Sequence, residues 1–94
     1  MLEQTSNDLE KASIYHQLGR TTSNQGQYEE AIQFYEKSLE IKQKTLPPNH
    51  PDLASSYNNN GLVYHKMGEH SKAILSHEAA LEIKQKTLPP NHPD

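Results

Sequence analysis

Apolar and small residues recur at spacings of three and four along most of the chain, which is the pattern of amphipathic helices. In the first half of the chain they are Leu9, Ala12, Tyr15, Leu18, Gly19 and Thr22, followed by Tyr28, Ala31, Ile32, Tyr35, Leu39 and Leu46. The positions between them are mostly polar. The pattern predicts four helices, over residues 8–24, 28–46, 51–66 and 70–87.

Local signals place the ends of these helices. Asn7 and Glu10 have the spacing of a capping box, so we expect the first helix to begin near Asp8. Gly26 and Gly68 each follow a helical stretch. A glycine in that place adopts the left-handed conformation and reverses the chain, so each predicts a helix-turn-helix.

The twelve residues IKQKTLPPNHPD occur twice, at 41–52 and at 83–94, which gives a repeat of 42 residues. Aligning 11–52 with 53–94 leaves 22 of the 42 positions identical. The paired prolines end the second helix, and Asn49 or His50 caps the third. A period of this length indicates stacked repeats, because one unit alone cannot cover its own apolar face.

Gly19 and Gly61 occupy the same place in the two copies, inside a predicted helix. Glycine there costs about 1 kcal/mol relative to alanine. A cost that recurs implies a structural need, and we expect another helix backbone to approach closely at both glycines.

Composition excludes several classes of protein. The net charge of −3 offers no basic stripe for a nucleic acid, and no stretch approaches the length of a membrane span. The chain has no Cys, which suits a reducing cytoplasmic location. It has no Trp and one Phe, which leaves few large apolar side chains for a deep core. Beyond these limits, composition points to no particular activity.

Key positions in both copies resemble the tetratricopeptide repeat pattern of aromatic, Leu, small, aromatic, Ala, aromatic and Ala. They are Tyr15, Leu18, Gly19, Thr22, Ala31, Tyr35 and Ser38, then Tyr57, Asn60, Gly61, Tyr64, Ala73, His77 and Ala80. The 42-residue period and the repeated join are similar to those of kinesin light chain repeats. The resemblance implies an all-α, α-solenoid fold of two stacked helix-turn-helix units with four antiparallel helices. The units would span 1–52 and 53–94 and progress as a right-handed superhelix.

The same resemblance implies a protein-protein interaction module that binds a peptide in a concave groove lined by the first helix of each unit. By that analogy the groove residues are Ser13, His16, Gln17, Arg20 and Asn24 in one unit and Ser55, Asn58, Asn59, Leu62 and Lys66 in the other. Asparagine both donates to and accepts from a peptide backbone, and Arg20 and Lys66 pair with carboxylates. His16 and Arg20 replace the residue types of a carboxylate clamp, so that specialised site is not implied. The alternative is that this polar face is merely solvated.

The sequence contains no motif for catalysis. There is no G-x-S-x-G, no glycine-rich phosphate loop and no cysteine nucleophile, so we expect neither an enzyme nor a cofactor. His65, His70 and His77 lie near one another in sequence but no two are spaced i,i+4, which argues against a metal site. His50 and His92 belong to the repeated join and suit capping or loop packing.

An alternative function is a self-associating scaffold, a homo-oligomer that stacks head to tail or exchanges helices. Repeat arrays usually close with a polar capping helix, and no helical pattern follows the second join. We therefore expect Tyr64, Ile74 and Leu81 to lie at an exposed end. The first helix of another copy, Leu9–Asn24, would cover them.

Overall fold

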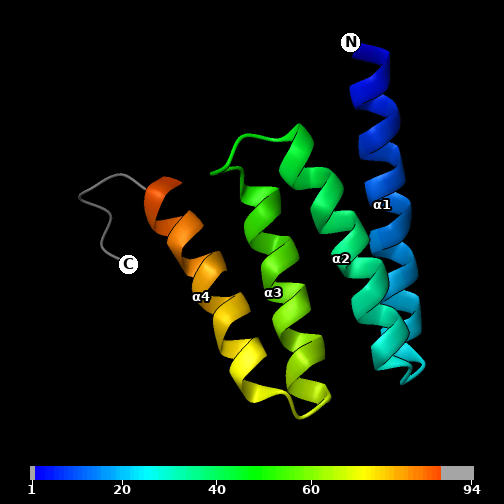
Figure 1. Ribbon diagram of the computed structural model, residues 1–94, viewed down its shortest axis with the longest axis vertical. Helices are drawn as coiled ribbons and strands as arrows, with labels where there is room; N and C mark the ends of the chain where they lie inside the picture. The colour runs from blue at the N-terminus through cyan, green and yellow to red at the C-terminus, as the bar shows by residue number, and fades with distance from the viewer. Residues whose placement is uncertain (1, 88–94) are drawn as a thin grey trace.

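The computed structural model describes residues 2–87 of the chain. They form four helices, α1 (Leu2–Asn24), α2 (Tyr28–Thr45), α3 (Pro51–Lys66) and α4 (His70–Thr87), as Figure 1 shows. Within these residues there is no strand. The all-α fold predicted from the sequence is confirmed.

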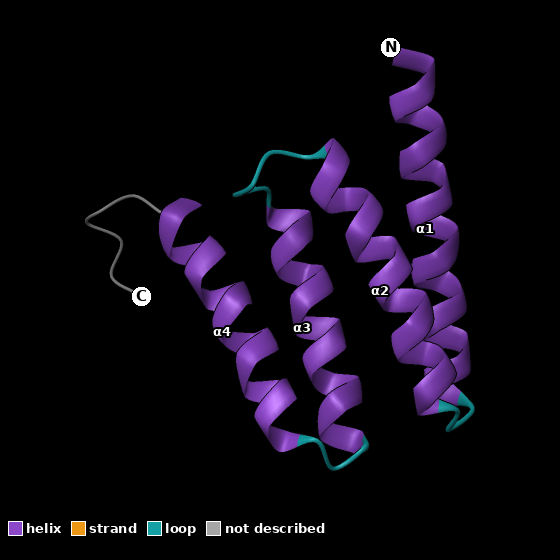
Figure 2. Ribbon diagram, viewed as in Figure 1, coloured by secondary structure: helices purple, strands orange, loops and turns teal. Residues whose placement is uncertain are grey.

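The helices pack in chain order as two antiparallel pairs. α1 packs with α2, α3 packs with α4, and α2 also packs against α3, so the two pairs stack side by side (Figure 2). The array measures 41 × 37 × 16 Å, which is thin because a helix with its side chains is about 10 Å across. The fold is therefore a short linear array of helix pairs.

Glycine makes the turn inside each pair. Gly26 and Gly68 have φ values of +83° and +81°, the left-handed conformation predicted for them. After α1 the N–H of Gln27 donates to the backbone carbonyl of Thr22 at 2.9 Å. After α3 the N–H of Glu69 donates to the backbone carbonyl of Tyr64 at 2.9 Å. These are the bonds of a Schellman motif, which satisfies carbonyls that the helix end leaves open.

The join between the pairs is built by its prolines and by a histidine. α2 ends at Thr45, and Leu46 before the prolines is extended. Nδ1 of His50 then accepts from the N–H of Asp52 at 3.1 Å, so His50 caps α3, with Pro51 as its first residue. The predicted cap by His50 is confirmed. The same expectation for His92 in the second copy of the join lies outside the described residues.

The predicted start of the first helix was wrong. α1 begins at Leu2 rather than near Asp8, and Asn7 is an exposed residue inside it. A capping box stops a helix only if the preceding residues cannot continue it. Leu2, Glu3 and Gln4 are good helix formers with no proline or glycine among them, so the helix extends through the motif.

Small and medium side chains make the contact between the pairs. One buried cluster joins Leu39, Leu53, Ala54, Ala80 and Ile83, and another joins Ala31, Ile32, Tyr35 and Val63. Both clusters combine residues of α2 and α3, so stacking of the two pairs forms the core. Ala31 and Ala73 are both buried, as their place in the repeat pattern implies.

Gly19 and Gly61 are needed for a different reason from the one predicted. A Cβ on Gly19 would lie 2.7 Å from ring atoms of Tyr35, and a Cβ on Gly61 would lie 2.7 Å from the ring of His77. The group that approaches is thus an aromatic side chain of the same pair, not a helix backbone. A flat ring lies directly on the helix where a side chain is missing.

Tyr64 also differs from expectation. Predicted to lie at the exposed end, it is half-buried, and its hydroxyl donates to Oε2 of Glu36 on α2 at 2.9 Å. Burial and this bond to Glu36 raise the pKa of Tyr64 to about 12. Tyr64 therefore helps to join the two pairs.

Candidate functional site

Residues of α1 and α3 flank a hollow of about 180 Å³ whose floor is on α2. We call it the groove. Its lining is Arg20, Ser23 and Asn24 from α1, Tyr35 from α2, and Asn59, Leu62, Val63 and Lys66 from α3. Five of the ten residues predicted from the polar face line it, namely Arg20, Asn24, Asn59, Leu62 and Lys66.

Tyr35 forms the floor of the groove and is 6% exposed. It reaches this place because Gly19 has no side chain to exclude its ring. The imidazole of His16 lies against it, with ring centres 5.2 Å apart. Burial raises the pKa of Tyr35, while Arg20 has the smaller, opposite effect. The floor is therefore aromatic and uncharged.

His16 on α1 contacts Asn59 on α3 and so links the first helices of the two pairs. Its Nε2 lies 3.4 Å from Nδ2 of Asn59, so a neutral imidazole accepts from the asparagine amide. Burial lowers the pKa of His16, and the charges of Lys42 and Arg20 lower it further. The neutral form, which the contact with Asn59 requires, is thus favoured.

The rim of the groove carries two cations. Arg20 stands on α1 and Lys66 on α3, and both are exposed. The ion pairs found within residues 2–87 include neither of them, although Nζ of Lys66 lies 5.9 Å from the ring centre of Tyr28. Both charges are available to a ligand.

A second hollow, of about 330 Å³, lies on α1 next to the groove. Gln17, Arg20, Thr21 and Asn24 line it. Arg20 and Asn24 line both hollows, so the two are neighbours. Gln17 therefore joins the predicted set through this neighbouring hollow.

The remaining predicted residues are not brought together. Ser13 and Ser55 are exposed and line neither hollow. Asn58 also lines neither, and its Oδ1 lies 3.0 Å from Nδ1 of His77 on α4. This contact belongs inside the second helix pair.

Sequence reasoning missed Tyr35, Ser23, Val63 and Thr21 as lining residues. Tyr35 was recognised only as one member of an apolar stripe. The repeat of Gly19 and Gly61 was the available signal, because a missing side chain marks where a bulky group lies. Nothing in the sequence showed that the bulky group would be the floor of a hollow.

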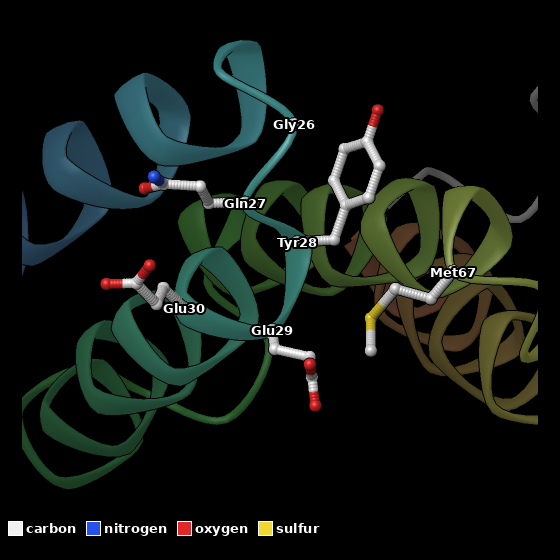
Figure 3. Close-up of a pocket in the computed structure, with 6 residues that line it drawn as sticks. All are labelled: Gly26, Gln27, Tyr28, Glu29, Glu30 and Met67. Atoms are coloured by element: carbon white, nitrogen blue, oxygen red, sulfur yellow. The ribbon is translucent and has the colours of Figure 1, made fainter.

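A larger hollow, of about 470 Å³, lies at the turn between α1 and α2 and shares no lining residue with the groove. Tyr28, Met67, Gly26, Gln27, Glu29 and Glu30 line it, as drawn in Figure 3. None of the predicted groove residues lines it. Size alone does not make it the functional site, since its polar groups do not converge on one point as Figure 3 shows.

The part of the chain that the structure describes contains no group of three His, Cys, Asp or Glu side chains placed to hold a metal ion. None of its helices is long and apolar enough to cross a membrane.

Comparison with known proteins agrees with the fold. No protein of curated function matches the sequence. The family model described as tetratricopeptide repeat matches residues 10–86, which includes most of α1 and nearly all of α4. The chain belongs to the tetratricopeptide repeat family.

Proposed function

We propose that this chain is a non-catalytic interaction module that binds a peptide segment of a partner protein in the groove between α1 and α3. Membership of the family supports protein binding in general. The observation that carries the specific proposal is the position of Arg20, Asn59 and Lys66 around one hollow with an aromatic floor.

The charges of the groove favour an anionic ligand. Arg20 and Lys66 stand on opposite sides of the groove, although the whole chain has a net charge of −3. Guanidinium and ammonium groups bind carboxylates by charge-assisted hydrogen bonds. We therefore propose a segment with acidic side chains or a terminal carboxylate as the ligand.

The asparagines supply hydrogen bonds to a peptide backbone. The contact with His16 uses Nδ2 of Asn59, and Oδ1 remains to accept from a peptide N–H. An asparagine amide offers two donors and an acceptor with two lone pairs, so one internal contact does not exhaust it. Asn59 then serves both the protein and the ligand.

The size of the groove limits its affinity. Hollows of about 180 and 330 Å³ admit a few side chains, and small contacts of this kind give weak complexes. We expect dissociation constants in the micromolar range or above.

The test is a peptide array, followed by fluorescence polarisation on the peptides that bind. Arg20→Ala and Lys66→Ala should each weaken binding about tenfold, since a lost charge-assisted bond costs about 1.5 kcal/mol. Lys44→Ala is the matched control, because Lys44 is exposed and lines neither hollow. Asn59→Ala should weaken binding and Asn58→Ala should not.

Equal binding by wild type, Arg20→Ala and Lys66→Ala would show that the groove is not the binding site. Binding that falls equally with Lys44→Ala would show that only net charge matters.

We also propose that these units are of the kinesin light chain type and act in the cytoplasm. The 42-residue period, the repeated join and the absence of Cys support this. A tagged copy that accumulates in an oxidising compartment would contradict the location.

A further inference from the structure

α4 exposes the face that α2 buries. Ile32 and Leu39 of α2 are 8% and 9% exposed, whereas the residues 42 positions later, Ile74 and Leu81 of α4, are 57% and 54% exposed. The two helices have the same apolar residue types at these positions. They differ in what packs on them, since no described helix lies on the far side of α4.

Inside the chain, α3 covers this face of α2. Leu53, Ser56, Asn60 and Val63 are the residues of α3 that become buried there, each less than 5% exposed. Polar contacts fix the register. Nζ of Lys42 donates to Oγ of Ser56 at 3.3 Å, and Nε2 of Gln43 donates to the hydroxyl of Tyr57 at 2.7 Å.

α1 is the counterpart of α3 and exposes the corresponding face. Ile14 stands where α3 has Ser56, and Leu18 stands where α3 has Asn60. They are 57% and 41% exposed, while Ser56 and Asn60 are 3% and 4% exposed. The chain thus carries both halves of its internal contact, unpaired, at opposite ends of the array.

We infer that a second copy of this chain docks head to tail, with its α1 packed on α4 in the way that α3 packs on α2. The internal contact specifies the occupant, because it shows which kind of helix covers such a face. The apolar residues of this contact, Ile14 and Leu18 on α1 and Ile74 and Leu81 on α4, do not line the groove.

The proposed contact loses apolar residues at two positions and gains them at two others. Lys11 and Thr21 replace Leu53 and Val63, which removes apolar area. Ile14 and Leu18 replace Ser56 and Asn60, which adds it.

The replacement of Asn60 also removes a polar defect. Oδ1 of Asn60 is buried and has no hydrogen-bond partner among the described residues. A buried polar atom without a partner is costly, so Leu18 suits a covered position better than Asn60 does.

One polar contact is available again in the proposed interface. Gln85 and Tyr15 are the counterparts of Gln43 and Tyr57, with the same residue types. The bond from Tyr64 to Glu36 would not recur, because Thr22 is the counterpart of Tyr64. The bond from Lys42 to Ser56 would not recur either, because Ile14 is the counterpart of Ser56. The pair of Gln85 and Tyr15 is therefore the polar contact that can mark the register.

Contacts of this kind are heterologous, since the two surfaces that meet are different. Each copy has one α4 face and one α1 face, so association continues beyond a dimer. It also places α1 of the next copy beside α3, where Gln17 would lie opposite Asn58 as Asn59 lies opposite His16. Stacking would thereby lengthen the groove.

The test uses two variants that damage one face each. Ile14→Lys places a charge on the α1 face, and Ile74→Lys places one on the α4 face. Both positions are more than half exposed, so the helical fold should persist and is checked by circular dichroism. Leu75→Lys is the control, because Leu75 is 66% exposed but its counterpart Gln33 remains exposed on α2.

Mass is measured by light scattering over a hundredfold range of concentration. Wild type and Leu75→Lys should grow in mass beyond a dimer, and each single-face variant should stay a monomer. An equimolar mixture of the two variants should give a dimer and stop there, because only one intact α1 face and one intact α4 face are present.

Three results would overturn the inference. The first is a constant monomer mass for wild type. The second is growth that Ile74→Lys prevents and Ile14→Lys does not, which would mean that α4 pairs with α4. The third is a closed dimer that both variants retain, which would indicate exchange of helices.

Discussion

The two helix pairs place different side chains in the same geometry. In the first pair Gly19 lies under the ring of Tyr35, and in the second Gly61 lies under the ring of His77, with the same clearance of 2.7 Å to a Cβ. Tyr35 is 6% exposed, however, and His77 is exposed. The cause is α3, which covers Tyr35 on α2, whereas no described helix covers α4.

The neighbours of the two rings are also exchanged. In the first pair an imidazole on α1, His16, lies against the tyrosine of α2. In the second pair Asn58 stands at the position of His16 and bonds to an imidazole on α4, His77. One repeat geometry therefore accepts either a ring-on-ring contact or a hydrogen bond. Burial, more than geometry, should decide how much each contact contributes to stability.

Truncation of the two rings should give the largest difference. Tyr35→Ala should destabilise the chain by about 3 kcal/mol, since it empties a buried site, and His77→Ala by less than about 0.5 kcal/mol, as exposed substitutions do. Urea unfolding followed by circular dichroism measures both. Equal losses would mean that burial by α3 does not set the contribution of the ring.

Filling the two glycines should give the next effect. Gly19→Ala pushes on a buried ring and should cost about 1–2 kcal/mol, because overpacking exceeds the gain in helix propensity. Gly61→Ala meets an exposed imidazole that can move away, so the propensity gain of up to about 1 kcal/mol should leave it neutral or stabilising. Thermal unfolding compares them. A Gly61→Ala loss as large as that of Gly19→Ala would contradict the comparison.

A hydroxyl buried only in the first pair gives a smaller effect. Oγ of Ser38 donates to the carbonyl of Ala12 at 2.7 Å, whereas its counterpart Ala80 has no such group. Ser38→Ala should cost about 0.5–1 kcal/mol. Ala80→Ser should change stability by less than about 0.5 kcal/mol, because Ala54 is the counterpart of Ala12 and its carbonyl should accept from the new hydroxyl. Denaturant midpoints report both. A neutral Ser38→Ala would show that the hydroxyl adds nothing.

The smallest effect is a pH dependence that arises from His16 in the first pair. Burial, Lys42 and Arg20 lower the pKa of His16 in the folded state below 6.5, so the unfolded chain binds the proton first as pH falls. The stability that neutral His16 contributes to the folded state is therefore fully present above about pH 6.5. It is lost progressively as the pH falls below that value. His16→Asn copies the second pair and should flatten this part of the stability profile. Identical profiles for the two proteins would exclude His16 as the cause.

Much of the fold follows from local signals. The positions of Gly26, Gly68 and Pro51 predict the turns and the start of α3, because φ preferences and missing donors act within a few residues. The start of α1 was the exception. A capping motif is a preference of about 1 kcal/mol, and the helix formers before it override so small a term.

The candidate site was only partly predictable. The repeat, the helices and a polar face on each first helix follow from the sequence alone, because periodicity and turn chemistry are properties of neighbouring residues. Tertiary structure decided which members of that face meet, bringing Arg20, Asn59 and Lys66 to one hollow and leaving Ser13 and Ser55 outside it. It also decided that Tyr35 is buried while His77 is exposed. The physical reason is that burial depends on what packs against a residue from another helix pair, and nothing within the repeat specifies that neighbour.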